Sequence, residues 1–343
     1  MVSLSEFDYP LPEELIAQQP VEPRDTSRML VVHRQTGSLE HRIFSQIVDY
    51  LRPGDVLVIN DTRVIPARLR GEKEGTGGRV EVLVFQALEA PSGGEVWKAL
   101  VRGKRVREGT RVRLRGGITA ILRERDGEGW VVEFQAPRPL LSLLHEIGEV
   151  PVPPYIHLPL RDPGAYQTVY ARRNGSVAAP TAGRHFTPSL LSRIEASGVE
   201  IVSVTLHIGP GTFLPVRVEE VTRHRMMPEA YEVSEEAAEK INEARSARGR
   251  IIAVGTSTVR TLESVADERG MVHPRKGWTD LFILPGYRFK VVDALVTNFH
   301  LPKSTLLMLV CAFAGRALIF SAYQEAILNR YRFGSFGDAM LIL

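Results

Sequence analysis

Four apolar runs of the sequence end on polar residues that could bind a ligand or transfer a proton. The endings carry hydroxyl, amide, imidazole or guanidinium groups and lie at residues 60–63, 207–213, 255–260 and 297–300. Ligands of an open α/β sheet bind outside the carboxyl ends of its strands. If these runs are strands of one sheet, their endings form a single binding or catalytic site.

The turn Gly255-Thr256-Ser257, followed by Arg260, is the clearest candidate for anion binding. Backbone N–H groups at a helix start hold carboxylates and phosphates, assisted by the helix dipole. The same residues also fit an ordinary strand-to-helix turn, and a single strand-end histidine is often structural. The coincidence of four polar strand ends favours the functional interpretation.

Several well-known catalytic motifs are absent from the sequence. It contains no Gly-x-x-x-x-Gly-Lys-Ser/Thr phosphate loop, no Gly-x-Gly-x-x-Gly turn and no His-Glu-x-x-His zinc motif. The single cysteine, Cys311, lies in an apolar run and is expected to pack in the core. The nine histidines are scattered along the chain, so we predict no metal site.

Alternating strands and helices predict the α/β fold that would position these endings. We expect a mostly parallel sheet with helices on both faces. The expected strands lie at residues 54–63, 199–209, 250–257, 280–286 and 291–300. The expected helices lie at residues 188–196, 235–247, 258–268, 304–314 and 318–331.

The segment between these parts has a different pattern. Short alternating runs at residues 79–85, 95–101, 110–115, 117–122 and 130–135 are separated by glycine-rich turns, which is typical of a small β-barrel or sandwich. The proline-rich stretch "EVPVPPYIHLPL" then ends the pattern. We therefore predict a discontinuous α/β catalytic domain, residues 1–65 and 154–343, with an inserted β-barrel domain, residues 66–153.

Charge and hydropathy are compatible with an RNA partner and with a cytoplasmic protein. Lys plus Arg (43) exceed Asp plus Glu (40) by three, which permits a nucleic-acid partner without requiring one. Acidic residues interrupt the N-terminus where a signal peptide needs an apolar segment. The longest apolar run, residues 305–314, is about half the length that spans a bilayer. We expect a cytoplasmic protein, with no membrane partner.

A basic stretch, "RGKRVREGTRVRLR", lies within the predicted barrel. Strand alternation places Arg111, Arg113 and Arg115 on one exposed face, and Lys104 and Arg105 precede them. These residues could contact RNA phosphates. A solvated strand face without a partner is the alternative.

Motifs along nearly the whole chain resemble one known family. The strings "DYPLPEELIAQQPVEPRDTSRMLVV", "INDTRVIPARL", "YQTVYA", "GSVAAPTAGRHFT", "HIGPGTFLPV", "GTSTVRTLES", "VVDALVTNFHLPKSTLLMLVCAFAG" and "FGDAMLI" closely resemble the S-adenosylmethionine:tRNA ribosyltransferase-isomerases of queuosine biosynthesis. The resemblance implies a Rossmann-like three-layer α/β domain with an inserted β-barrel. It also implies a reaction between S-adenosylmethionine, as co-substrate, and a tRNA.

In that reaction the ribose moiety of S-adenosylmethionine is transferred to 7-aminomethyl-7-deazaguanine at the tRNA wobble position and is isomerised. The product is epoxyqueuosine-tRNA, and adenine and methionine are released. The sulfonium acidifies the adjacent ribose carbon, so the first step calls for a base. The candidate bases are His185, His207 and His300. A monomer is compatible with the length and composition.

Further roles follow from the chemistry that the resemblance implies. Asp61 or Asp293 could protonate the departing adenine, and Glu229 could accept a second proton. The methionine carboxylate suits Arg260 or the amides of Gly255, Thr256 and Ser257. Adenine suits the amide of Asn298, with Thr297 beside it, and the rings of Phe213 and Phe299 could stack on adenine or face the sulfonium.

The sequence departs from the family pattern at four positions, Arg184, Met227, Gly334 and Phe336. Met227 stands where the family commonly has a second histidine, so no proton transfer is assigned there. Two other functions compete with the one implied. An S-adenosylmethionine-dependent RNA methyltransferase would need an acidic, glycine-containing loop after its first strand, which "VLVINDTRV" lacks. A non-catalytic RNA-binding module would leave the polar strand ends unexplained.

Overall fold

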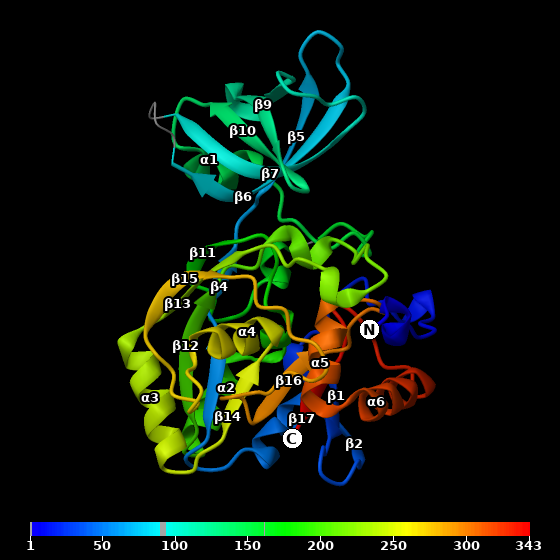
Figure 1. The fold of residues 1–343 in the computed structure, drawn as a ribbon, viewed down its shortest axis with the longest axis vertical. Helices are drawn as coiled ribbons and strands as arrows, with labels where there is room; N and C mark the ends of the chain where they lie inside the picture. The colour runs from blue at the N-terminus through cyan, green and yellow to red at the C-terminus, as the bar shows by residue number, and fades with distance from the viewer. Residues whose placement is uncertain (1, 90–93, 161) are drawn as a thin grey trace. The chain divides into compact units, whose positions relative to one another are not determined.

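A computed structural model describes residues 2–89, 94–160 and 162–343. The chain forms two compact units, each with its own core (Figure 1). The sheet unit comprises Met1–Arg63, Pro153–Arg173 and Ala179–Leu343, and the barrel unit comprises Val64–Val152 and Asn174–Ala178. Residues 174–178, which we expected in the α/β domain, therefore group with the barrel.

The sheet unit is built on a nine-stranded sheet with the order β15-β13-β12-β3-β14-β16-β17-β1-β2. Its strands are β1 (Arg28–Val32), β2 (Leu39–Ile43), β3 (Val56–Asn60), β12 (Glu200–Leu206), β13 (Glu229–Val233), β14 (Ile251–Val254), β15 (Arg275–Thr279), β16 (Ala294–Asn298) and β17 (Ala339–Ile342). The four neighbours β12, β3, β14 and β16 run parallel. Antiparallel pairs flank them, so the sheet is mixed rather than mostly parallel.

Helices cover both faces of this sheet. They are α2 (Pro188–Ala196), α3 (Glu235–Ser246), α4 (Thr256–Val265), α5 (Thr305–Ala314) and α6 (Arg316–Leu328), with the 3-10 helices η4 (Phe44–Tyr50) and η7 (Thr181–His185). On one face, Phe44 and Leu190 from η4 and α2 pack with Leu57 and Val296 of the strands. On the other face, α4 packs over the four parallel strands and α6 over β1. Burial on both faces explains the continuous apolar runs of the parallel strands.

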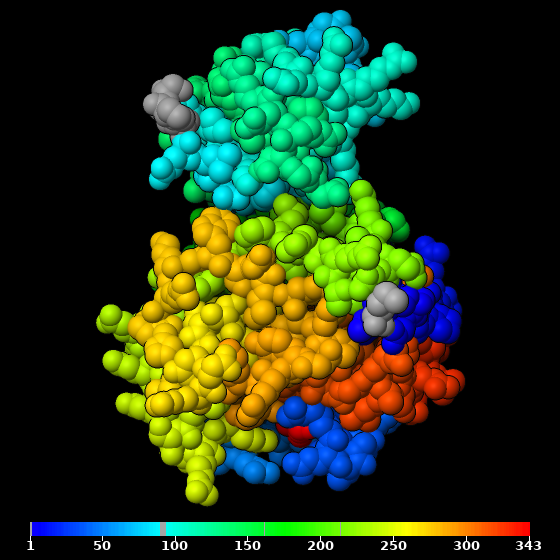
Figure 2. Space-filling view, viewed as in Figure 1, coloured from blue at the N-terminus to red at the C-terminus, as the bar shows by residue number. Residues whose placement is uncertain are grey.

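The C-terminal helices α5 and α6 are short and sharply angled. No single helix within residues 2–89, 94–160 and 162–343 is long and apolar enough to cross a membrane. α5 and α6 pass that test only as a pair, and they bend by 115° at their junction. The junction is Gly315, whose φ of 86° lies in the left-handed region that glycine adopts most readily. Figure 2 shows α6 at the surface of the sheet unit.

The barrel unit contains a closed six-stranded barrel with the order β10-β7-β6-β5-β8-β9. Its strands are β5 (Arg68–Lys73), β6 (Arg79–Leu88), β7 (Glu95–Gly103), β8 (Arg111–Leu114), β9 (Thr119–Asp126) and β10 (Gly129–Gln135), and α1 (Leu140–Ile147) follows them. Val82, Leu122 and Val132 are fully buried inside it. The predicted fold class, a layered α/β unit with a small β-barrel, is confirmed.

The remaining elements are short. Strands β4 (Thr62–Val64) and β11 (Arg173–Ser176) form a separate two-stranded sheet. The other 3-10 helices are η1 (Leu4–Phe7), η2 (Glu13–Leu15), η3 (Arg24–Thr26), η5 (Arg115–Gly117), η6 (Pro163–Tyr166), η8 (Pro210–Phe213) and η9 (Val221–Arg223).

The prediction of a strand at residues 280–286 is wrong. The sheet position belongs instead to β15, the charged segment just before it, which pairs with β13. The Arg260 side chain donates a hydrogen bond to the Leu281 carbonyl. Pro285 has no N–H that could donate to a neighbouring strand. The apolar segment therefore forms a loop that still buries Ile283.

Candidate active site

The four polar endings lie at one edge of the sheet, here called the carboxyl edge, because their strands are parallel neighbours. Asn60, at the end of β3, connects three of the elements. Its amide donates to the Leu206 carbonyl at 3.0 Å and to Ser257 Oγ at 3.1 Å, and its Oδ1 accepts from the Leu206 N–H at 3.1 Å. Asn60 is fully buried, and the sequence had placed it in a polar ending without assigning it a role of its own. It fixes the ends of β12 and β3 and the start of α4 relative to one another.

Asn298 and His185 form a buried hydrogen-bonded pair at the end of β16. The Asn298 amide contacts His185 Nε2 at 3.2 Å, and Asn298 Oδ1 accepts from Thr181 Oγ1 at 3.1 Å. His185 Nδ1 lies 2.7 Å from Ser27 Oγ. Both ring nitrogens of His185 therefore have protein partners. Burial, followed by the positive charges of Arg184 and other arginines, lowers the pKa of His185 to about 3.

His300 differs from His185 in keeping one ring nitrogen free. Its Nε2 lies 2.8 Å from Thr297 Oγ1, and within the described residues its Nδ1 makes no hydrogen bond. The backbone is fixed as well, because the His300 N–H donates to the Tyr323 hydroxyl at 2.9 Å and the Tyr9 hydroxyl donates to the His300 carbonyl. Burial lowers the pKa of His300 to about 3, so the imidazole is neutral at pH 7.

Glu229 and Arg260, which we expected to act separately, form one buried ion pair. Arg260 Nη1 contacts Glu229 Oε2, and the side chains are 8% and 5% exposed. Arg260 also donates to the carbonyls of Leu281 and Thr279, at 2.9 and 3.3 Å, and Glu229 Oε1 accepts from the Gly209 N–H at 2.7 Å. Each nitrogen of the guanidinium thus has one protein acceptor, and the pair connects β13, α4 and the turn after β12.

Asp61 and His207 lie at the ends of β3 and β12. The buried carboxylate of Asp61 accepts from Thr205 Oγ1 and from Arg172 Nε, both at 2.6 Å. His207 Nδ1 lies 2.8 Å from Thr62 Oγ1. Burial lowers the pKa of His207, with the nearby Asp61 acting in the opposite direction. Both carboxylate oxygens of Asp61 therefore have protein donors, and His207 keeps its Nε2 without a described partner.

The start of α4 presents backbone N–H groups at the carboxyl edge. Gly255 precedes the helix with φ at 89°, and its own N–H donates to the Val296 carbonyl at 2.8 Å. The helical hydrogen bond at this end runs from the Val259 N–H to the Gly255 carbonyl. The amides of Thr256 and Ser257 precede that bond, and both residues are about 8% exposed. The amides of Thr256 and Ser257 are thus without an intrahelical acceptor.

Tyr170 is a candidate that the sequence-based reasoning missed. Its buried hydroxyl has no hydrogen-bond partner within the described residues. A Cβ on Gly183 of η7 would lie 1.9 Å from this hydroxyl, so any other residue at position 183 would have to displace the Tyr170 side chain. The motif "YQTVYA" contained this tyrosine, but nothing in the sequence indicated which hydroxyl would be left unpaired.

Two predicted site residues are unsuited to the roles assigned to them. Asp293 precedes β16, roughly 16 Å from Asn298 along the strand, and its carboxylate accepts from the Ile251 N–H at 2.8 Å. Phe299 is fully buried among the rings of Tyr323, Tyr331 and Phe333, so it has no free face for adenine. Both assignments are corrected. The side chain of Phe213 lies outside the described part of the structure.

The residues of β16 fall on two sides of the sheet. Asn298 follows Val296 on the face covered by η7, whereas Thr297 points to the opposite face, as strand alternation requires. His300, bonded to Thr297, lies on the same side as Tyr323 of α6. His185 and His300 therefore lie on opposite sides of the sheet at the end of β16.

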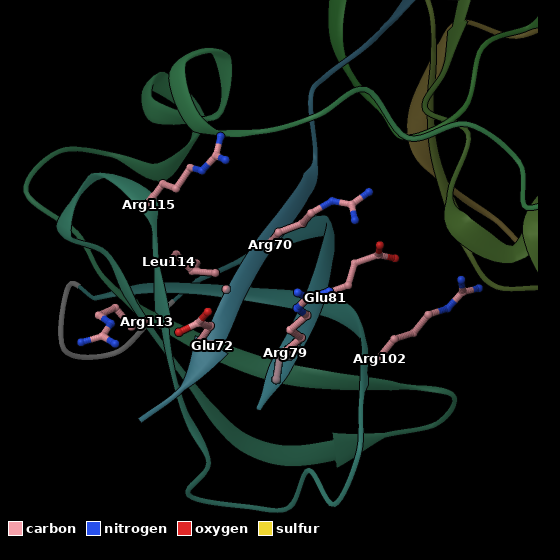
Figure 3. A pocket seen from close by; sticks show the side chains of 10 residues that line it. Arg70, Glu72, Arg79, Glu81, Arg102, Arg113, Leu114 and Arg115 are labelled. Carbon is pink, nitrogen blue, oxygen red and sulfur yellow. The ribbon is translucent and has the colours of Figure 1, made fainter. Parts of the chain in front are cut away.

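The barrel has a basic recess of its own. It is lined by Arg70, Gly71, Glu72, Arg79, Val80, Glu81, Arg102, Arg113, Leu114 and Arg115, and Figure 3 shows their side chains around β5 and its neighbours. Arg113 and Arg115 form no ion pair with a described residue. Arg111 instead pairs with Glu74 at 2.7 Å, and it lines a second recess with Arg105. Lys104 is exposed, and its carbonyl accepts from Lys73 Nζ at 2.6 Å.

Comparisons with known proteins agree along the whole chain. Residues 4–342 match the model of a family described as queuosine biosynthesis protein. An S-adenosylmethionine:tRNA ribosyltransferase-isomerase from Symbiobacterium thermophilum is 58% identical over 99% of both chains, and one from Pelotomaculum thermopropionicum is 56% identical over 100% of both. The crystal structure of an S-adenosylmethionine tRNA ribosyltransferase from Thermotoga maritima is 42% identical, with a TM-score of 0.57 over 99% of this chain and 100% of that one. The chain belongs to the queuosine biosynthesis protein family.

Proposed function

We propose that this protein is an S-adenosylmethionine:tRNA ribosyltransferase-isomerase. It transfers the ribose moiety of S-adenosylmethionine to 7-aminomethyl-7-deazaguanine at the wobble position of a tRNA and isomerises it, releasing adenine and methionine. The match to the family and to its curated members over nearly every residue carries this conclusion. The polar carboxyl edge supplies a place for the chemistry.

His300 is the proposed base for the first proton transfer. The sulfonium of S-adenosylmethionine acidifies the neighbouring ribose carbon, and a neutral imidazole with an unoccupied nitrogen can take that proton. His300 and His207 each have such a nitrogen, whereas His185 uses both of its nitrogens within the protein. His185 is therefore a positioning residue for Asn298.

The co-substrate is proposed to lie along the ends of β14 and β16. The free amides at Thr256 and Ser257 suit the methionine carboxylate, because the neighbouring Arg260 is already engaged by Glu229. Asn298 suits adenine, although adenine must then compete with Thr181 and His185 for the amide. The unpaired Tyr170 hydroxyl is a further donor that a substrate could satisfy.

The barrel recess is the proposed contact for the tRNA backbone. The stretch from Arg102 to Arg115 contains seven Lys or Arg and one Glu, and Arg113 and Arg115 are free of ion pairs in the described structure. Phosphates are recognised mainly by such cationic side chains. We also propose that the enzyme works in the cytoplasm as a monomer, on a tRNA that already carries the aminomethyl-deazaguanine base.

Isotope labelling tests this function against its alternatives. The protein is incubated with precursor tRNA and with S-adenosylmethionine labelled either in the ribose or in the methyl group. We expect ribose label in the tRNA and no methyl label. Methyl label in the tRNA would identify a methyltransferase, and binding of tRNA without transfer of either label would identify an RNA-binding module.

A further inference from the structure

A recess beside His185 gathers three arginines from distant parts of the chain. Arg24 comes from η3, Arg184 from η7 and Arg332 from the segment after α6. The recess is small and opens to solvent, with about 180 Å³ not filled by protein atoms when its open mouth is included. Ser27, Phe336 and Gly337 complete most of its lining. Residues 27 and 337 precede β1 and β17, whose N-terminal ends lie at the carboxyl edge. The recess is therefore an extension of the candidate active site.

Arg184 is buried without a counter-charge. It is 4% exposed, and within the described residues it forms no ion pair. Its Nε donates to the Ala165 carbonyl at 2.6 Å, its Nη1 lies 3.5 Å from the Ser335 carbonyl, and its guanidinium lies 4.7 Å from the centre of the Phe336 ring. Its Nη2 donates to no described residue. A buried charge without an anionic partner is costly, which indicates that an anion completes the site.

The other two arginines add positive charge that their partners do not fully cancel. Among the described residues, Arg24 pairs with the exposed Glu22 at 3.8 Å and donates to the carbonyls of Gln167 and Gly164. Arg332 pairs with Asp338 at 3.3 Å. The three arginines thus have two carboxylate partners between them, Glu22 and Asp338, which leaves one positive charge unbalanced. Burial, and next the charge of Arg24, lower the pKa of Arg184 to about 10, as expected where positive charge is in excess.

We propose that this recess is an oxyanion subsite in which Arg184, with Arg24 and Arg332, holds a phosphate group of the tRNA substrate. Guanidiniums bind phosphate and carboxylate oxygens in the same paired geometry, so the methionine carboxylate is the other possible source of the anion. Phosphate is preferred because several cations converge there and because the start of α4 is available for the carboxylate. The inference rests on the proposed function for the identity of the substrate.

Binding measurements on the full-length protein test the subsite without turnover. Arg184→Met removes the charge at similar length, Arg184→Lys keeps it, and Arg24→Met provides a second, partly exposed position. Arg193→Met, an exposed position on α2 with no ion pair in the described structure, is the matched control. Affinity for unmodified precursor tRNA is measured by filter binding over a salt series, affinity for S-adenosylmethionine by calorimetry, and the thermal midpoint with and without inorganic phosphate.

For Arg184→Met we expect tRNA affinity to fall by about 10- to 100-fold, with a salt slope lower by about 0.7 to 0.9. S-adenosylmethionine affinity should not change. Phosphate should raise the thermal midpoint of the wild type and of Arg193→Met but not of Arg184→Met. A reduction confined to S-adenosylmethionine affinity would keep the oxyanion subsite and assign it to the carboxylate.

Two outcomes separate the subsite from the proposed reaction. Unchanged binding of tRNA, S-adenosylmethionine and phosphate by both Arg184→Met and Arg24→Met would overturn the subsite. If the variants bind tRNA and phosphate more weakly, as expected, but the wild type transfers no ribose, only the proposed reaction is refuted.

Discussion

The three histidines of the site differ in what their ring nitrogens contact, and this difference separates their roles. His300 has a free nitrogen and a rigid backbone, so we expect His300→Ala to lower turnover by about 10²- to 10⁴-fold. Binding of S-adenosylmethionine and tRNA, and the thermal midpoint, should stay close to wild type. His273→Ala, at an exposed histidine of the same unit, serves as the control. Wild-type turnover in His300→Ala would transfer the role to His207.

We expect the buried His185 to make the stability of the fold depend on pH. Its pKa is about 3 in the folded protein, against about 6.5 in an unfolded chain. Between these values the unfolded state binds a proton that the folded state excludes, so stability falls as the pH drops from 6.5. The loss is up to about 1.4 kcal/mol per pH unit for this group.

Urea denaturation at pH 7 and pH 4.5 measures this loss. We expect His185→Gln to lose less stability between the two pH values than the wild type, even if it is less stable at pH 7. An equal or steeper loss in the variant would show that His185 does not control the acid transition.

At the scale of elements, the Glu229–Arg260 pair is the contact that joins β13 to α4. Removing one partner of a buried ion pair leaves the other charge unpaired and costs about 3–5 kcal/mol. We expect Arg260→Met to destabilise by this amount and Glu229→Gln/Arg260→Met to recover part of it. Denaturation of the wild type, the two single variants and the double variant gives the coupling free energy between the two side chains. Additive effects would mean that the two side chains act independently.

Strand β8 and the first residue of η5, which follows it, allow an internal comparison of arginines in the barrel. Arg113 and Arg115 face the open recess, whereas Arg111 is paired with Glu74. Arg113→Ala/Arg115→Ala should therefore flatten the dependence of log tRNA affinity on log salt, by about 0.7 to 0.9 for each phosphate that these side chains neutralise. Arg111→Ala should have a smaller effect. If the double variant keeps the wild-type slope, these arginines serve solubility rather than RNA binding.

Strands that are buried on both faces could be predicted from the sequence, and edge strands could not. β3, β12, β14 and β16 have continuous apolar runs, so their positions and their polar ends followed from the sequence. β15 is charged because it lies at the sheet edge, and it gave no apolar signal. The apolar segment after it, residues 280–286, matched the pattern of a buried strand better than β15 did.

Individual side-chain contacts could not be predicted either. Asp293 and Asn298 belong to the same strand region, but its direction places them at opposite edges of the sheet. Phe299 looked available for stacking until the rings of Tyr323 and Phe333, distant in sequence, were found to cover it. The pairing of Glu229 with Arg260 likewise depends on how β13 and α4 pack, which no local pattern encodes.

At the scale of the whole molecule, the two units have separate cores. The barrel closes on itself, and the sheet is covered by its own helices. We propose that residues 66–153 form a domain that unfolds independently of the rest. Calorimetry should then resolve two transitions, and a ligand of the sheet unit such as S-adenosylmethionine should raise only one of them. A single transition that shifts as a whole would contradict this division.

In the function proposed above, one polar sheet edge cleaves S-adenosylmethionine and passes its ribose to tRNA. Quantifying free adenine, free methionine and modified tRNA in one reaction with precursor tRNA tests this directly. We predict that the three appear in equal amounts, that none appears without tRNA, and that His300→Ala lowers all three together. Release of S-adenosylhomocysteine, or tRNA modification without free adenine, would contradict the proposed reaction.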